Sequence, residues 1–423
     1  MELLNLIMGQ ADMVSEMKYE CIRAKSMMSK QKGVDNWFNS LHSMNPYRGC
    51  EFGCVYCDGM SESYHVDNFL THIRIKENAP EIVRKELESF GFSSQSKMET
   101  ESLLPFLESE DAKRLRETGP PKFIIGVSGG VSDAYQHVER EHKITRKILE
   151  VMLDFEMPIF LLTKSDLVLR DLDLLKEIHD RALVNIGFTV TIMDEETKNV
   201  FEPKSATVYE RLEALKEIRD AGLHGGIAAM PLIPGISDTE ENMRRLTEEA
   251  TRAKSEYILW GGLTLKPGRQ KDYFMSVLRK RFPDNRPLIE RVYQNEDPYG
   301  APAYKLLPVN VIKEGYRLCR EYNTDYRIPL WPIEGVPRIN QVIIEILLRI
   351  SFHIKYIQEQ PWHRARPFDA AIRSLENNIE GEITLNNLIA IAERLQLNQR
   401  AVSVIMEILE HGESSLLHSF ELE

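Results

Sequence analysis

Residues 45–59 have the sequence NPYRGCEFGCVYCDG, which places three of the chain's five cysteines in one short segment. Cys50, Cys54 and Cys57 are separated by three and then by two residues. A loop with this spacing can bend around a 4Fe-4S cube so that each thiolate ligates a different iron. One iron is then left for a cofactor. Gly49 and Gly53 give the backbone the freedom that such a tight curve requires.

A zinc site is the alternative for the same cysteines. Structural zinc takes four ligands, usually as two pairs of cysteine or histidine. The sequence has no second pair: His65 is the nearest candidate for a fourth ligand, and Cys21 and Cys319 are isolated. The cluster is therefore the favoured interpretation. Clustering of this kind also argues against a secreted disulfide framework, in which cysteines are spread along the chain.

Composition predicts an ordered protein of two or three domains. The chain has 423 residues, of which 43% are hydrophobic and 28% charged, enough for a large core. A net charge of −12 speaks against a protein that lives on nucleic acid. The basic segment 266–281 could form a local basic face, although a solvated helix surface is the favoured interpretation.

No membrane or export segment is expected. The most apolar C-terminal stretch, VIIEILLRISFHI, is interrupted by Glu345 and Arg349, which indicates a packed helix rather than a membrane span. The start MELLNLIMGQADM lacks the pattern of a signal peptide. The expected location is the cytoplasm.

From residue 120 onward, short apolar runs alternate with segments of helical spacing. Strands are expected at 122–128, 158–164, 184–190, 225–235 and 256–265, and helices at 144–155, 171–182, 205–222 and 238–254. Such alternation predicts parallel βα units. A further strand near 41–48 would bring the count to six. The expected fold is therefore α/β, a partial (β/α)6 barrel with its chemistry at the C-terminal ends of the strands.

Three domains are predicted. Residues 1–44 are expected to form an amphipathic helix and a linker, 45–334 the partial barrel with an inserted loop around 91–120, and 335–423 a helical domain. Thr384 and Asn398 are expected to cap two C-terminal helices, the second ending at Gly412, and Asp238 to cap the helix at 238–254. A helix-turn-helix is disfavoured because Arg400 is the only early basic residue of the second helix.

The motif CxxxCxxC with an aromatic residue before the last cysteine resembles the signature of the radical S-adenosylmethionine (SAM) superfamily. Tyr56 occupies the aromatic position, which in the family lies against the adenine of the cofactor. The wider segment NPYRGCEFGCVYC resembles the branch of spore photoproduct lyase and DNA repair photolyase-like proteins. The resemblance covers residues 44 to about 270 and implies a 4Fe-4S cluster and S-adenosylmethionine as cofactors.

The resemblance also implies cofactor-binding residues at the strand ends. Ser128, Gly129 and Gly130 would face the methionine amino group, Lys164 the carboxylate, and Thr189 with Thr191 the ribose. For Lys164 a solvated lysine is the alternative. Further matches to the branch are Asp133, Tyr135, Gln136 and Glu139, the pair Glu202-Pro203, Arg211, and the turn MPLIPG at 230–235. Ala134 and His137 stand where relatives commonly carry proline.

In the implied reaction, a flavodoxin or ferredoxin type of donor reduces the cluster, S-adenosylmethionine is cleaved, and a 5′-deoxyadenosyl radical takes hydrogen from a substrate. The lyase uses a further cysteine as hydrogen donor, but this chain has none between Cys57 and Cys319. Tyr64 and Tyr135 are the expected catalytic substitutes. The substrate could be a DNA lesion, although the acidic charge does not support this, or a protein, peptide or small metabolite. A non-enzymatic metal-binding module is the remaining alternative.

Overall fold

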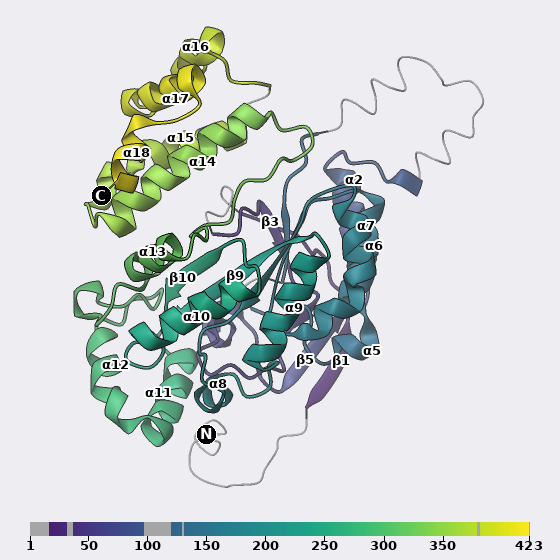
Figure 1. The fold of residues 1–423 in the computed structure, drawn as a ribbon. Coiled ribbons are helices and arrows are strands. Elements are labelled where there is room, and N and C mark those ends of the chain that lie inside the picture. The colour runs from purple at the N-terminus through teal and green to yellow at the C-terminus, as the bar shows by residue number, and fades with distance from the viewer. Residues whose placement is uncertain (1–16, 32–36, 97–119, 129–130, 379–380, 423) are drawn as a thin grey trace.

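A computed structural model describes residues 17–31, 37–96, 120–128, 131–378 and 381–422 (Figure 1). Its main sheet has the strand order β10-β9-β8-β7-β6-β3-β2. All neighbours pair in parallel except β2, which runs antiparallel to β3. The strands are β2 (Ser29–Lys30), β3 (His42–Met44), β6 (Ile125–Val127), β7 (Ile159–Thr163), β8 (Val184–Thr189), β9 (His224–Leu232) and β10 (Ile258–Gly262).

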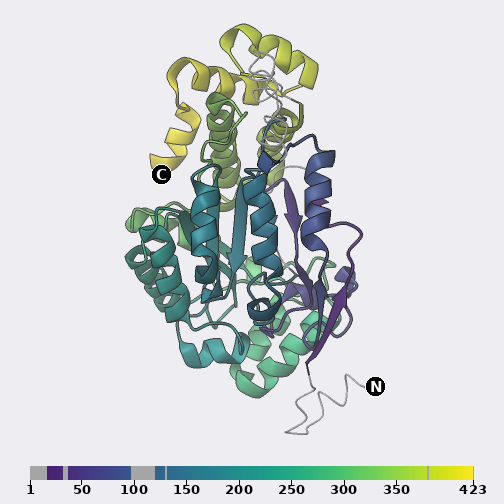
Figure 2. The same ribbon diagram turned by 90° about the vertical axis from the view of Figure 1, so that its right-hand side faces the viewer.

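The six parallel strands follow one another across the sheet in chain order, which confirms the expected (β/α)6 arrangement, including the strand sought near 41–48. All six residues of β8 are buried, as expected for a parallel strand covered on both faces. The helices α2 (Ala79–Ser89), α6 (Ile144–Asp154), α7 (Leu172–His179), α9 (Val208–Asp220) and α10 (Glu240–Arg252) cover one face of the sheet (Figures 1 and 2).

The helix starts follow from local capping. Thr207 and Glu210 form a reciprocal capping box at the start of α9. Helix α10 begins after Thr239, whose hydroxyl accepts the N–H of Asn242 at 3.2 Å. The predicted cap, Asp238, is wrong by one residue: its carboxylate accepts the N–H of Gly235 and closes the preceding turn.

The N-terminal segment departs from expectation. Residues 1–16 lie outside the described residues, but 17–44 hold strands where we expected a helix. Strand β1 (Lys18–Ile22) pairs in parallel with β5 (His72–Lys76), and β5 pairs with β4 (Tyr47–Arg48) in a small second sheet. An amphipathic pattern in a short segment fits a helix or an edge strand, and the open edge of β5 decides for the strand.

The C-terminal part is helical, as predicted, and comprises α14 (Arg338–Phe352), α15 (Arg366–Asn378), α16 (Leu385–Leu395), α17 (Gln399–His411) and α18 (Ser415–Leu422). Thr384, Asn398 and Gly412 occupy the predicted cap positions. These helices share a hydrophobic core of their own. The domain boundary near residue 335 stays a prediction, and most of the inserted loop around 91–120 lies outside the described residues.

The two ends of the sheet have different neighbours. At the N-terminal ends of the strands, Trp331 stacks on His224, the first residue of β9, with ring centroids 4.0 Å apart. The C-terminal helices lie beyond this end (Figures 1 and 2). The remaining described helices are α5 (Glu139–His142), α8 (Glu195–Phe201), α11 (Arg269–Arg281), α12 (Arg286–Val292) and α13 (Val311–Glu321). The opposite end, where the strands terminate, carries the residues of the predicted site.

Among the described helices, none combines the length and the apolar character needed to cross a bilayer.

Candidate functional site

The cysteine loop follows β3 and β4 and curls back on itself. Cys50 and Cys54 are buried and Cys57 is partly buried. The thiols are close enough to influence one another, because Cys54 and Cys57 both raise the pKa of Cys50 after the larger effect of burial. The N–H of Cys57 donates to the carbonyl of Cys54 at 3.1 Å. The loop therefore gathers its three sulfur atoms in one buried place.

Glycine and glutamine hold this loop in shape. Gly49 has a φ of +88°, and a Cβ at this position would lie 2.7 Å from the carbonyl oxygen of His72. No other residue fits there without a shift of the backbone. Gln136 accepts the N–H of Glu51 at 2.9 Å and donates to the carbonyl of Gly49 at 3.2 Å. Gln136, which the sequence singled out, thus positions the loop from the turn after β6.

The donor set fits a cluster better than a single ion. Burial raises the pKa of each thiol, that of Cys54 to about 12, so that a bound metal would have to displace the thiol protons. Within the described part of the chain, no group of three or more His, Cys, Asp and Glu side chains is arranged to hold one metal ion. Structural zinc needs four converging ligands. In a 4Fe-4S cube each cysteine binds a different iron, so the sulfurs do not converge on one point.

A buried charge network lies against the loop. The Tyr56 hydroxyl donates to Glu202, and Arg211 forms an ion pair with Glu202 at 2.6 Å, with each side chain 1% exposed. Burial would raise the pKa of Glu202, but Arg211 and then Lys164 outweigh it and hold this pKa at about 2. The carboxylate is therefore ionised at neutral pH and fixes the Tyr56 side chain.

Lys164 lies at the centre of this network, one residue beyond β7. Its ammonium nitrogen is 5.7 Å from the centroid of the Tyr56 ring. Burial lowers the pKa of Lys164, but Cys54 and Glu202 outweigh burial and raise it. The backbone N–H of Lys164 donates to Asp133 at 2.9 Å. The ammonium group itself has no hydrogen-bond partner among the described residues, so its donors are left for an anionic group.

The other expected cofactor residues lie at the same strand ends. Ser128 has a φ of +73°, and its hydroxyl donates to the carbonyl of Ser132 at 2.9 Å within the turn after β6. Gly129 and Gly130 lie outside the described residues. The carbonyl of Thr189 accepts from Arg211 at 2.7 Å, and Thr191 donates to Glu202 at 3.2 Å.

The two tyrosines expected to be catalytic are separated. Tyr64 donates to Asp58, the residue after Cys57, at 2.6 Å, and the ammonium of Lys266 lies 4.6 Å from the Tyr64 ring centroid. Tyr135 is fully buried, and its neighbours are Asp171, Glu139 and Arg170. Tyr64 is therefore the tyrosine placed beside the cysteine loop, whereas Tyr135 belongs to an ion-pair network under α6.

One positioning residue escaped sequence reasoning. Gln270, buried at the start of α11, donates to the carbonyl of Tyr56 at 2.9 Å and to that of Thr264 at 3.0 Å. It lies 214 residues from Tyr56 in the chain. No local pattern marks such a contact, because only the folded sheet brings α11 to the loop.

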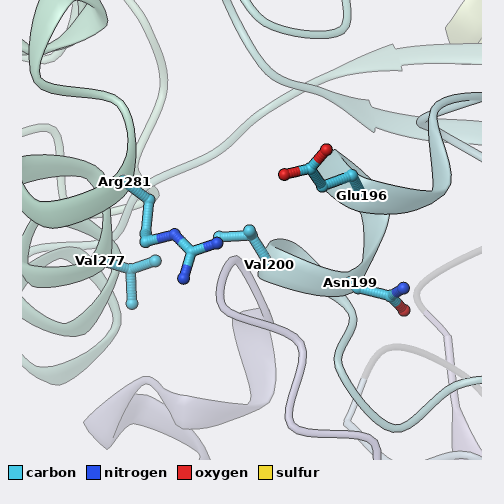
Figure 3. Close-up of a pocket in the computed structure, with 5 residues that line it drawn as sticks. All are labelled: Glu196, Asn199, Val200, Val277 and Arg281. Atoms are coloured by element: carbon cyan, nitrogen blue, oxygen red, sulfur yellow. The ribbon is translucent and has the colours of Figure 1, made fainter.

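A surface pocket of about 390 Å³ lies between α8 and α11 (Figure 3). Glu196, Asn199 and Val200 line it from α8, and Val277 and Arg281 from α11. None of the residues expected at the site is among those that line it. The chemistry is therefore sought at the cysteine loop.

Comparisons with known proteins agree with this geometry. Residues 44–247 match the family model of the radical SAM superfamily. An uncharacterized protein of Methanocaldococcus jannaschii is 26% identical over 250 residues, which covers 58% of this chain and 78% of that protein. One of Mycobacterium tuberculosis strain H37Rv is 24% identical over 269 residues, covering 62% and 70%.

Among solved structures, a spore photoproduct lyase mutant aligns with a TM-score of 0.49 and 15% identity, over 72% of this chain and 78% of that one. The cobalamin-dependent radical enzyme OxsB aligns with a TM-score of 0.35 and 12% identity, over 90% and 55%. The family match spans the cysteine loop, Lys164 and the Glu202–Arg211 pair. This chain is therefore a radical SAM enzyme, with its superfamily domain at residues 44–247 and with the 4Fe-4S cluster and S-adenosylmethionine of that family as its cofactors.

Proposed function

We propose that Cys50, Cys54 and Cys57 hold the cluster and that the chain catalyses hydrogen abstraction from an organic substrate. On one-electron reduction, the bound cofactors supply a 5′-deoxyadenosyl radical. The observation that carries the proposal is the group of buried thiols beside an ammonium, that of Lys164, without a hydrogen-bond partner among the described residues. A flavodoxin or ferredoxin type of protein is the proposed electron donor.

The chain's own residues bind and orient the second cofactor. Lys164 would pair with the carboxylate of S-adenosylmethionine, since a point charge at a strand end suits an anion. Tyr56 would lie against the adenine, Thr189 would bond the ribose, and the turn that begins at Ser128 and includes Gly129 and Gly130 would receive the amino group. The Glu202–Arg211 pair fixes Tyr56 and excludes water from the loop.

The direct test is product analysis after anaerobic reconstitution with iron and sulfide. With dithionite and S-adenosylmethionine, the full chain is expected to form 5′-deoxyadenosine and methionine in equal amounts, because one cleavage yields both. The same mixture without dithionite is the control and is expected to form neither. A reconstituted chain that forms neither product with dithionite would refute the proposed chemistry.

Lys164→Gln is expected to weaken binding of S-adenosylmethionine about tenfold or more, because a hydrogen bond to a charged group contributes about 1.5–3 kcal/mol. The cluster absorbance is expected to remain. Lys216→Gln, on the exposed face of α9, is the matched control. Equal dissociation constants for Lys164→Gln and the unchanged protein would remove Lys164 from the cofactor site.

A DNA lesion is the first candidate substrate, because the segment NPYRGCEFGCVYC resembles the branch of spore photoproduct lyase. Cys319 does not supply the missing hydrogen donor: it is fully buried in α13, where the Trp260 indole donates to its sulfur at 3.3 Å. Tyr64 is the candidate donor, because its hydroxyl is connected to the cysteine loop through Asp58.

Tyr64→Phe separates the two steps of this reaction. With dinucleoside spore photoproduct as the probe, the variant is expected to keep 5′-deoxyadenosine formation and to lose at least about 90% of the repaired product, since general proton or hydrogen transfer contributes about 100-fold or more. Unchanged repair would exclude Tyr64 as donor. No repair by the unchanged protein would favour a protein, peptide or small metabolite as substrate.

A further inference from the structure

A second cavity, of about 370 Å³, opens on the other side of the cysteine loop from α11. Four basic residues line it: Arg23 and Lys25 after β1, Arg48 on β4, and Lys76 at the end of β5. Ser26 and the Tyr64 hydroxyl-bearing ring add polar groups. No acidic residue is among the described residues that line it. In a chain with a net charge of −12, such a cluster creates a local positive field opposite to the average.

These cations are for the most part not neutralised. Arg23 faces Glu77 and Glu81 at 3.5 and 3.7 Å, in pairs exposed to solvent. Lys25, Arg48 and Lys76 form no ion pair with the described residues. Lys76 donates to the carbonyl of Asn45 at 2.7 Å and Arg48 to that of His65 at 2.9 Å. Neutral carbonyls orient these side chains but leave their charge without a counterion.

Burial shows the strain of this arrangement. Lys76 is partly buried, and desolvation, followed by the charge of Arg48, lowers its pKa to about 8. A like charge and burial both disfavour an ammonium. A bound anion would reverse both effects, so the pocket is electrostatically prepared for a negatively charged group.

The position of the cavity connects it to the radical site. Asn45 follows β3 and Val131 follows the turn after β6, and both line the cavity at the C-terminal ends of the strands. A Cβ built on Gly59 in the cysteine loop would lie 3.2 Å from the Cα of Val131. Tyr64 lines the cavity and also bonds Asp58, next to Cys57. A group anchored here borders the loop that holds the proposed cluster.

We propose that this cavity binds the phosphate group of a phosphorylated small-molecule substrate. Three uncompensated cations suit a phosphate dianion better than a single carboxylate, and arginine and lysine are its usual ligands. A volume of about 370 Å³ is that of a small-molecule site, whereas nucleic acid is bound by basic surface that follows the backbone. The inference rests on the proposed function and specifies the substrate class of the same site.

The test is isothermal titration of the reconstituted full chain with inorganic phosphate in a phosphate-free buffer. Binding is expected, and Lys25→Gln and Lys76→Gln are each expected to weaken it about tenfold, in keeping with loss of one charged hydrogen bond. Lys25 is exposed and has no partner among the described residues, so its variant is expected to fold. Lys18→Gln, on exposed β1 outside the cavity, is the matched control and is expected to bind as the unchanged protein does.

Absence of phosphate binding at millimolar concentration, or equal binding by all variants, would overturn the inference. A third titration uses a single-stranded oligodeoxynucleotide without terminal phosphates. If it binds more tightly than phosphate and loses affinity in Lys25→Gln, a nucleic acid replaces the small molecule and the proposal is wrong. Neither titration contains S-adenosylmethionine or reductant, so failure of radical chemistry would be seen separately, in the 5′-deoxyadenosine assay.

Discussion

Cys54→Ala is expected to abolish 5′-deoxyadenosine formation, with a loss of at least about 1,000-fold, equivalent to about 4 kcal/mol of activation free energy. Cys54 is buried between Cys57, Lys164 and Glu202. Without its thiolate, one iron of the cube would lack its ligand, and no other cysteine is placed to replace it, because Cys319 is packed in α13. The measurement is chromatography of the products under dithionite.

The matched control is the same substitution at Cys21, which is exposed on β1. Cys21→Ala is expected to keep the iron content and the activity within about twofold, as surface substitutions usually do. Equal activity in Cys54→Ala and Cys21→Ala would show that the cysteine loop is not the metal site. Loss of activity in both would point to a structural rather than a ligating role.

Arg211→Met is expected to reduce the free energy of unfolding by about 3–5 kcal/mol, because it leaves the buried Glu202 carboxylate without its cation. The guanidinium of Arg211 also donates to the carbonyls of Thr189 and Ala206, both at 2.7 Å. The midpoint of guanidinium chloride unfolding measures the loss. The double variant Arg211→Met with Glu202→Gln is expected to recover part of it, because the uncompensated charge is then gone.

Two comparisons make this prediction specific. Arg286→Met breaks an exposed pair with Glu290 at 2.7 Å and is expected to change stability by about 0–1 kcal/mol. The pH dependence gives the second. The folded state holds the pKa of Glu202 at about 2, below its ordinary value of 4.5, so its contribution is complete above pH 4.5 and is lost as the pH falls toward 2. An Arg211→Met midpoint equal to that of Arg286→Met would contradict the account.

Local sequence signals were sufficient for the strands and for the metal-binding loop. The apolar runs at β6 to β10 are bounded by turns, and the cysteine spacing lies within one loop, so each is visible in a short window. Even β3, three residues long, was expected from its place before the loop. Caps at Thr384 and Asn398 were found for the same reason.

Features that depend on distant partners were missed or misjudged. Strand β1 exists because β5, 54 residues further along, offers an open edge. Gln270 supports Tyr56 from α11. Tyr135 follows a motif of the site, but the backbone after β6 turns its ring into the core beside Asp171. The basic cavity combines residues from three strands of the small sheet, and no single segment shows its charge.

The most direct test of the central claim is the iron content and the electron paramagnetic resonance spectrum of the reconstituted full chain. The account predicts about four irons and four sulfides per chain, and a spectrum of the reduced protein that changes when S-adenosylmethionine is added, because one iron lacks a protein ligand. One zinc per chain, or a cluster whose spectrum does not respond to S-adenosylmethionine, would contradict it.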